Sequence, residues 1–413
     1  MTDELKLGLD TFGDVVVRAD GSTAPYDEVL RNVVEQGVLA DQVGVDAFGV
    51  GEHHRDDYAV SAPDLVLAAI GARTERIVVG SAVTVLSSDD PIRVYERFAT
   101  LDGLTGGRAE VTLGRGSFTE SFPLFGYDLA DYEQLFSEKL DLFAALRDEG
   151  PVSWSGTHRR PLVDTEVFPK TARGTLPVWI GVGGSPESVV RTAHYGFGLM
   201  LAIIGGDPAR FKPYVDLFTR ALTELGRPRQ PIGVHAPGFI ADTDDEAREK
   251  LFAHFKKNRD RVGRERGWVP LTKEAFLDDI EHGALHVGSP ETVARKIART
   301  VGALGLDRFD TGQAALERRG KVAQQLVFRY AHRLLDPRQG VLGDQPVLLL
   351  AQQQADGRLV VRRLHLRIHR REVKVELACM FGLEGRRLQL DHHIALQARV
   401  IKKEVDEKFV ARH

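Results

Sequence analysis

Short apolar runs alternate with amphipathic segments along the first 310 residues. On either side of the apolar run at 47–51, residues 26–43 and 63–73 carry apolar side chains at helical spacing. A buried strand between two amphipathic helices is typical of a parallel sheet covered by helices. The run at 76–86 is rich in β-branched residues, as expected of a strand that is buried on both faces. These patterns predict an α/β protein.

The same alternation predicts eight strands in residues 1–310. The expected strands are 5–12, 47–51, 76–86, 109–114, 177–182, 198–203, 232–236 and 306–309. The expected helices are 26–43, 63–73, 89–104, 131–147, 186–194, 207–225, 244–266 and a last one that starts near 289. Such a series predicts a (β/α)8 TIM barrel, with a doubly wound open sheet as the alternative. Prolines and turns at 151–173 predict an inserted excursion such as a hairpin.

Polar or small residues follow several of these strands directly. They are Glu52, His53 and His54 after the second strand, Ser81, Ala82, Val83 and Thr84 in the third, Arg115 between Gly114 and Gly116 after the fourth, and Gly183, Gly184 and Ser185 after the fifth. The carboxyl ends of parallel strands lie at one end of a barrel, where active sites are built. The sequence therefore predicts one site at this end.

The segment that begins at Gly183 has a direct mechanism for binding phosphate. Its glycines allow close approach of the backbone, Ser185 is a typical N-cap, and Pro186 suits the first helical position. Free amides and the helix dipole at such a helix start favour an anion, and Arg115 adds a guanidinium that binds phosphate well. The nearly identical segment 288–291 shows that the motif can also be an ordinary helix start, so both interpretations stay open.

Three interpretations compete for Glu52, His53 and His54. One inward-facing His as acid/base is preferred because an imidazole titrates near neutrality, and neighbouring side chains on a strand point to opposite faces. A structural, hydrogen-bonded His is the second interpretation. A metal site would need further ligands, and no His-x-x-x-His spacing accompanies the doublet. No metal is therefore expected.

Composition and charge narrow the function further. No apolar run approaches the length of a membrane span, and Cys379 is the only cysteine, so an intrachain disulfide or a cysteine zinc cluster is excluded. The N-terminus lacks the pattern of a secretory signal, which favours a cytoplasmic location. Residues 1–310 carry 35 Lys+Arg against 48 Asp+Glu. Such an acidic body argues against nucleic-acid binding.

Together these motifs resemble the luciferase-like flavin-dependent monooxygenases. The resemblance covers roughly residues 5–310 and rests on the segments 52–54, 79–86, 101–108, 113–116, 183–185 and 287–293. It implies a (β/α)8 barrel that binds reduced FMN, or its deazaflavin analogue F420 in a sister branch. It also implies roles for single residues: His53 as the catalytic acid/base with Glu52 beside it, Ala82-Val83 as a non-proline cis peptide under the flavin with Thr84 next to it, Arg115, Ser185 and Ser188 as phosphate ligands, and Gly116, Gly183 and Gly184 as backbone close to the cofactor.

The reaction implied by the resemblance is oxidation of a small organic substrate by O2 and reduced flavin. No second nucleotide-binding unit is visible, so a separate flavin reductase is expected to supply the reduced FMN. The resemblance also suggests a homodimer, without membrane or nucleic-acid partners. The alternatives are an F420- or FMN-linked hydride-transfer dehydrogenase and a non-catalytic flavin-binding protein. Segments 118–127 and 151–173 are expected to select the substrate.

Residues 311–413 differ in composition from the rest of the chain. They carry 20 Lys+Arg against 11 Asp+Glu, and 10 glutamines against 4 in the preceding 310 residues. This shift predicts a boundary near Thr311. We hypothesise that 311–413 is a basic extension foreign to the family, such as the product of a shifted reading frame. Residues 314–335 still have apolar side chains at helical spacing and are a candidate for the closing helix of the barrel.

Overall fold

A computed structural model describes residues 5–15, 18, 21–116 and 118–313, and the strands at 348–353, 359–368 and 371–375. The chain divides into two compact units, residues 1–339 and 340–413. The first unit contains every site residue expected from the sequence.

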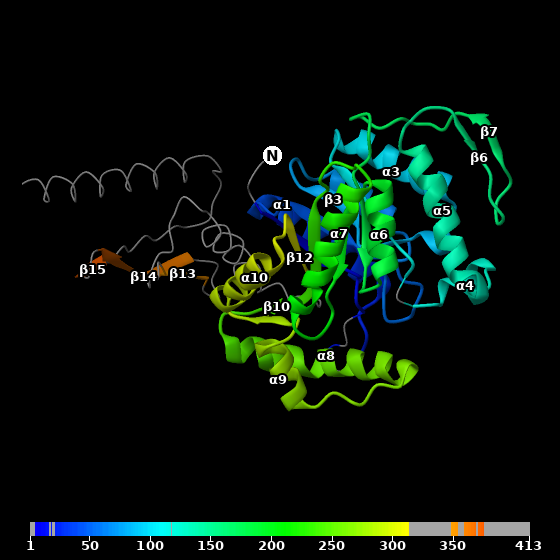
Figure 1. Ribbon diagram of the computed structural model, residues 1–413. Helices are drawn as coiled ribbons and strands as arrows, with labels where there is room; N and C mark the ends of the chain where they lie inside the picture. Colours follow the sequence, from blue (N-terminus) through cyan, green and yellow to red (C-terminus); the bar gives the residue numbers. More distant parts are fainter. Residues whose placement is uncertain are drawn as a thin grey trace, which may run out of the picture. The chain divides into compact units, whose positions relative to one another are not determined.

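Eight parallel strands of the first unit close into a barrel (Figure 1). The last strand pairs with both the first and the seventh, because Arg308 lies opposite Lys6 on one side and opposite Gly233 on the other. The TIM barrel is therefore confirmed, and the open sheet is excluded. In order around the ring the strands are β1 (Lys6–Thr11), β2 (Ala47–Val50), β3 (Val78–Ser81), β5 (Ala109–Gly114), β8 (Val178–Val182), β9 (Gly198–Ala202), β10 (Ile232–Ile240) and β12 (Arg308–Gln313).

Helices connect successive barrel strands. They are α1 (Tyr26–Val43), α2 (Pro63–Gly71), α3 (Pro91–Thr105), α5 (Tyr132–Leu146), α6 (Pro186–Tyr195), α7 (Lys212–Glu224) and α10 (Pro290–Leu304). Their starts follow local sequence signals. The Asp90 side chain caps α3 and the Ser185 hydroxyl caps α6, and each cap is followed by a proline at the first helical position.

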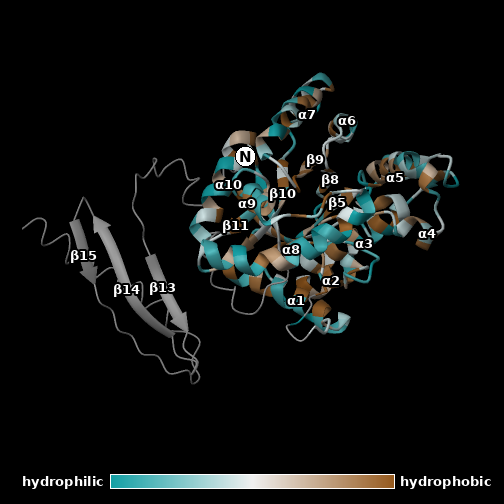
Figure 2. Cartoon of the chain, turned by 90° about the horizontal axis from the view of Figure 1, so that it is seen from below, coloured by the Kyte–Doolittle hydropathy of each residue, from teal (hydrophilic) through white to brown (hydrophobic). Residues whose placement is uncertain are grey.

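Alternate residues of each barrel strand face the helices or the interior of the barrel. On β1, Leu7 and Leu9 belong to the hydrophobic core that the strands share with the helices, and Figure 2 shows hydrophobic residues gathered along the strands. Burial of each such side chain contributes about 1.5–3 kcal/mol. Their neighbours Gly8 and Asp10 occupy the other face of the strand. This inner face carries polar groups that become important at the site.

The structure corrects the third predicted strand and confirms the inserted hairpin. The run at 76–86 is not one strand but β3, a cis peptide at Ala82-Val83, β4 (Thr84–Val85) and the 3-10 helix η1 (Leu86–Ser88). Within 151–173, β6 (Val152–Trp154) and β7 (Leu162–Thr165) pair antiparallel. Between β5 and α5 lie the short helix α4 (Ser121–Phe125) and the 3-10 helix η2 (Leu129–Asp131), and the 3-10 helix η3 (Pro208–Phe211) precedes α7.

A second insertion lies between β10 and α10. It consists of α8 (Asp244–Arg266), α9 (Lys273–Glu281) and β11 (His286–Gly288), and β11 extends the sheet beside the end of β10. Phe276 and Ile280 of α9 pack with Leu251 of α8 in a small hydrophobic core separate from the main one. The predicted charged helix at 244–266 is confirmed.

In the second unit, β13 (Leu348–Gln353), β14 (Leu359–Ile368) and β15 (Arg371–Val375) form an antiparallel sheet. The change of composition at Thr311 falls within β12 of the barrel. The candidate closing helix at 314–335 lies outside the described residues. None of the helices in the described part of the chain has the length and apolar content needed to span a membrane.

Candidate active site

Three strand ends converge on the Ala82-Val83 peptide, which is cis as the resemblance implied. The Ala82 N–H donates to the carbonyl of Val50 at the end of β2 (2.9 Å). A Cβ on Gly114 of β5 would lie 2.6 Å from Val83 Cγ2, and one on Gly181 of β8 would lie 3.1 Å from Val83 Cγ1. A side chain at position 114 would clash with Val83, and one at position 181 would be tight, so these glycines let both strands approach the cis peptide closely.

The carboxylate of Glu52 turns away from His53 and toward His54. It lies 3.0 Å from His54 Nε2, and its other oxygen accepts from the Val85 N–H at 2.9 Å. The expected role of Glu52 beside His53 stays a prediction, and the structure shows that its carboxylate contacts His54 and Val85. Glu52 is nearly fully buried and links the end of β2 to β4. These contacts tie the segment that carries both histidines to β4.

A different carboxylate, Glu120, lies beside His53. Its Oε1 is 3.8 Å from His53 Nδ1 and accepts from the His54 N–H at 3.4 Å. Burial opposes ionisation of Glu120, but its contacts with His53 and with backbone N–H groups lower its pKa overall. Sequence reasoning missed Glu120, because it lies in a loop without a motif.

Three aromatic rings surround the His53 imidazole. The ring centroids of Phe12, Tyr58 and Phe118 lie 5.1, 4.4 and 5.1 Å from that of His53. Only 11% of the His53 side chain is exposed. The two adjacent histidines have different neighbours, since His54 contacts Glu52 and Phe125 whereas His53 has three aromatic rings around it. An imidazole in such a setting exchanges protons with little competition from bulk water.

Arg115, Ser185 and Ser188 come together at the N-terminus of α6. Arg115 Nη2 donates to Ser188 Oγ at 3.3 Å, and the Ser188 N–H donates to Ser185 Oγ at 3.2 Å. The charge of Arg115 is balanced by Glu133, whose side chain is 56% exposed, through contacts of 2.7 and 2.9 Å. The three predicted phosphate ligands therefore form one cationic cradle, which at present holds an exposed carboxylate.

The remaining predicted residues line the same region. Gly116 and Gly184 have φ angles of 79° and 120°, which favour glycine. A Cβ added to Gly183 would meet no atom within 4 Å, so the space on the side where a side chain would project is open. Thr84 is buried, and its hydroxyl has no hydrogen-bond partner among the described residues.

The structure distinguishes the two similar helix starts that the sequence left open. At α10, the Asp244 carboxylate accepts from the Ser289 N–H at 2.6 Å and from the Thr292 hydroxyl at 3.0 Å. This helix start is thus occupied by an internal anion, and Gly288 leaves the space for it. At α6 the two carboxylates in contact with the cradle residues, Glu133 and Glu187, are both exposed, whereas Asp244 is partly buried. The α6 start is therefore the one suited to an external anion.

Arg191 is a further cation at this cradle that the sequence analysis missed. It lies three residues after Ser188, on the same face of α6, and its Nη2 is 3.5 Å from Glu133. Its buried Nη1 has no hydrogen-bond partner among the described residues. The helical spacing from Ser188 was the available signal.

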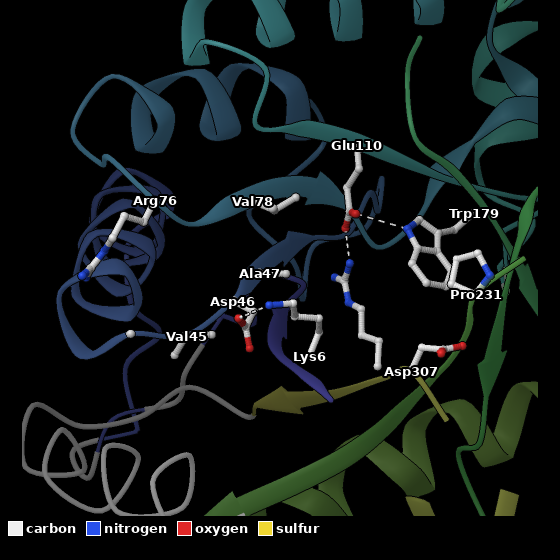
Figure 3. A pocket seen from close by; sticks show the side chains of 12 residues that line it. Lys6, Val45, Asp46, Ala47, Arg76, Val78, Glu110, Trp179, Pro231 and Asp307 are labelled. Atoms are coloured by element: carbon white, nitrogen blue, oxygen red, sulfur yellow. Dashed lines mark hydrogen bonds and ion pairs between the residues drawn. The ribbon is translucent and has the colours of Figure 1, made fainter. Parts of the chain in front are cut away.

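The barrel interior holds ionisable groups that the sequence analysis also missed. Arg308 on β12 pairs with Glu110 of β5, and its Nε donates to Asp310 at 2.7 Å. Glu110 also accepts from the indole N–H of Trp179 at 3.1 Å, and both line a cavity of about 470 Å³ at the amino ends of the strands (Figure 3). Nearer the mouth, Asp10 pairs with His235.

Metal ligation finds no support in the described part of the chain, where no three His, Cys, Asp or Glu side chains gather as ligands.

Comparison with known proteins identifies relatives among oxygenases. The chain is 33% identical over 289 residues to 4-hydroxyprotoasukamycin monooxygenase of Streptomyces nodosus subsp. asukaensis, covering 64% of this chain and 76% of that protein. It is 28% identical to N-acetyl-S-alkylcysteine monooxygenase of Bacillus subtilis (strain 168), covering 70% and 88%. It is 27% identical to the alkanal monooxygenase alpha chain of the Kryptophanaron alfredi symbiont, with 56% and 65% covered. The chain thus spans slightly less than two thirds of that alkanal monooxygenase chain. It is also 29% identical to the uncharacterized protein y4vJ of Sinorhizobium fredii (strain NBRC 101917 / NGR234), covering 43% of this chain and 50% of that protein.

Solved structures share the fold at lower identity. Monooxygenase RslO1 from Streptomyces bottropensis superposes with a TM-score of 0.65 at 21% identity, over 81% of this chain and 99% of that chain. The oxygenating constituent of 3,6-diketocamphane monooxygenase of Pseudomonas putida, solved with FMN, gives 0.64 at 18% over 79% and 98%. An F420-dependent secondary alcohol dehydrogenase gives 0.63 at 19% over 79% and 99%. The sequence model of the luciferase-like monooxygenases matches residues 12–308, and the chain belongs to that family.

Proposed function

We propose that this chain is an FMN-dependent monooxygenase, which uses reduced FMN and O2 to oxidise a small organic substrate. The observation that carries the proposal is the loop 115–120, which begins at the cationic cradle and ends at His53. Arg115 contacts Ser188 in the cradle, and a few residues later Phe118 and Glu120 contact His53. A cofactor phosphate and the proton-exchanging imidazole therefore belong to one site.

The residues of the cradle fit a phosphate group. Arg115, Ser185 and Ser188 would bind its oxygens, and Arg191 would supply a second guanidinium with an unused buried N–H. Glu133 is exposed, so it can swing away when a stronger anion arrives. Both flavin phosphates and F420 meet these requirements. FMN is proposed because the relatives of 27–33% identity carry monooxygenase names, whereas the likeness to the F420 enzyme rests on fold alone.

The residues around the cis peptide fit the ring system of a flavin. Ala82 and Val83 lie where the ends of β2, β5 and β8 meet, and glycines on β5 and β8 hold these strands close. The Thr84 hydroxyl is buried without a partner in the described structure, so it is a candidate donor to the cofactor. When bound, reduced FMN supplies the two electrons with which O2 is activated.

His53 is the residue proposed to move protons at this site. Its imidazole lies against Phe12, Tyr58 and Phe118, which exclude water from the reacting groups. The Glu120 carboxylate lies 3.8 Å from Nδ1 and is the nearest described acid with which the imidazole can exchange a proton. Glu52 acts on the reaction only by fixing the loop, through Val85 and His54.

The test uses the purified full chain with FMN, a separate NADH-dependent flavin reductase and 18O2. An alkanal and an S-alkyl-N-acetylcysteine serve as probe substrates, since relatives carry these names. We expect saturable FMN binding and a product that contains one 18O atom. His53→Ala should abolish product formation while it leaves FMN affinity unchanged, and His282→Ala, an exposed control, should change neither.

Two results would refute the proposed monooxygenase function and favour another function. Saturable FMN binding without any effect of the protein on reoxidation of reduced FMN would identify a flavin-binding protein without catalysis. Reduction of F420 by an alcohol, without 18O incorporation, would identify a hydride-transfer dehydrogenase. Loss of FMN affinity in His53→Ala would remove His53 from the catalytic role and make it a binding residue.

A further inference from the structure

Three ionisable side chains meet inside the barrel just below the mouth. They are Asp10 on β1, His235 on β10 and Asp310 on β12. Asp10 and Asp310 are 3% and 2% exposed, and the side chain of His235 is 15% exposed. Asp10 Oδ2 is in hydrogen-bond contact with His235 Nδ1, and Asp310 is tied to Arg308 on its other side. The proposed function uses none of these groups.

The barrel leaves space for these side chains through glycines on neighbouring strands. A Cβ on Gly49 would lie 1.9 Å from Asp10 Oδ1, and one on Gly8 would lie 2.0 Å from Asp310 Oδ1. A Cβ on Gly312 would lie 3.0 Å from His235 Cε1. Barrel interiors are usually filled by branched apolar residues. This barrel instead accommodates a polar cluster, which costs desolvation energy and calls for a function.

The charges of the cluster do not balance without additional protons. The carboxylates of Glu110 and Asp310 share one guanidinium, that of Arg308, and the carboxylate of Asp10 faces His235. Burial raises the pKa of Asp310 to about 7 against the opposing charge of Arg308, and Asp10 and Glu110 add to the rise. Burial lowers the pKa of His235, but its hydrogen bond to Asp10 and the charges of Asp10 and Asp310 outweigh it and raise that pKa overall. Both shifts favour the protonated forms of Asp310 and His235.

His235 lies level with the mouth rather than deep in the barrel. Its carbonyl accepts from the N–H of Ile203, just after the end of β9. The Phe12 ring lies between the two imidazoles, 5.9 Å from His235 and 5.1 Å from His53. Asp10 engages Nδ1 of His235, and no described residue makes a hydrogen bond to Nε2. The side chain of His235 is partly exposed, which leaves part of the ring open to a ligand in the mouth.

We propose that Asp10, His235 and Asp310 form a shared-proton cluster, and that His235 is a second acid–base residue, besides His53, for the ligand bound in the mouth. The N–H bond at Nε2 breaks, and the proton passes to a nitrogen or oxygen atom of the ligand that carries negative charge. His235 is left neutral, with its Nδ1–H donating to Asp10. One part of this inference rests on the proposed function, namely that the ligand is reduced FMN or the substrate that the enzyme oxidises.

The cluster is tested by NMR titration of the full chain without ligand, with histidine labelled by 13C at Cε1. His235→Asn identifies the signal of His235 among the 14 histidines. We expect its midpoint to lie above the usual value of about 6.5 and to fall by about one pH unit or more in Asp10→Asn. Asp310→Asn should lower it by a smaller amount. Asp307→Asn, just before β12 and paired with Arg229, should leave it unchanged. An unshifted midpoint in Asp10→Asn would overturn the cluster.

Contact with the ligand is tested by adding reduced FMN without oxygen. We expect the His235 signal to move on saturation, and the control substitution His254→Asn on α8 to leave this movement unchanged. Binding of FMN without movement of the His235 signal would overturn the acid–base role while the proposed function stands. Absence of FMN binding would overturn both that role and the proposed function, and the midpoint without ligand would still decide the cluster.

Discussion

Replacement of Arg308 by Met is expected to lower the free energy of unfolding by roughly 3–5 kcal/mol at about pH 8. Arg308 is 7% exposed, pairs with Glu110 through Nη1, and donates from Nε to Asp310 at 2.7 Å. Met is of similar length but carries no charge. Both carboxylates would therefore stay buried without their cation, which costs more than the pair itself contributes.

The loss should depend on pH in a definite direction. Burial already raises the pKa of Asp310 to about 7 in the presence of Arg308, and removal of the cation raises it further. A carboxyl group whose pKa is higher in the folded than in the unfolded state destabilises the folded state, and this cost is complete once the pH exceeds the folded-state pKa. The cost disappears as the pH falls toward the unfolded value of about 4. The difference between Arg308→Met and the wild type should therefore narrow from about pH 8 to about pH 5.

Thermal unfolding followed by tryptophan fluorescence measures this loss. At about 2 °C per kcal/mol for a large domain, the midpoint should fall by roughly 6–10 °C. The control is Arg229→Met, since Arg229 pairs with Asp307 near the surface and is 56% exposed. Such a pair contributes at most about 1 kcal/mol. A loss below about 1 kcal/mol for Arg308→Met, or one independent of pH, would refute a buried charge cluster.

Three further outcomes are expected. Arg115→Met should weaken FMN binding by about 10- to 100-fold with little change in stability. FMN affinity is measured by fluorescence quenching, and an unchanged affinity would exclude Arg115 from the phosphate site. Asp244→Asn should lower the free energy of unfolding by about 1–2 kcal/mol, because the Asp244 carboxylate caps α10. FMN affinity should not change, and weakened FMN binding would indicate that the phosphate binds at α10 instead. Burial lowers the pKa of His286 to about 3, so stability should fall as the pH drops from about 6.5, by up to about 1.4 kcal/mol per pH unit. His286→Gln should reduce this slope in urea unfolding, and an equal slope in both proteins would contradict the assignment.

The sequence by itself determined the elements of the barrel and the candidate positions at its mouth. Strand periodicity, the serine and proline at the start of α6, and glycines beside Arg115 are local signals, because they concern residues within a few positions of one another. Seven strands were located within a few residues of their bounds. The third differs because a cis peptide at Ala82-Val83 divides an apolar run in which no local pattern marks a break; only the family resemblance pointed to this peptide.

Only the tertiary structure decided which groups meet. Closure of the barrel brings Asp10 to His235 across 225 positions, and Glu110 to Arg308 across 198. The folded loops also bring Glu120 to His53 and place Asp244 at one of two nearly identical helix starts. These pairings depend on strand register and on the loops between strands. No local pattern encodes them, because their energy arises only when distant segments pack together.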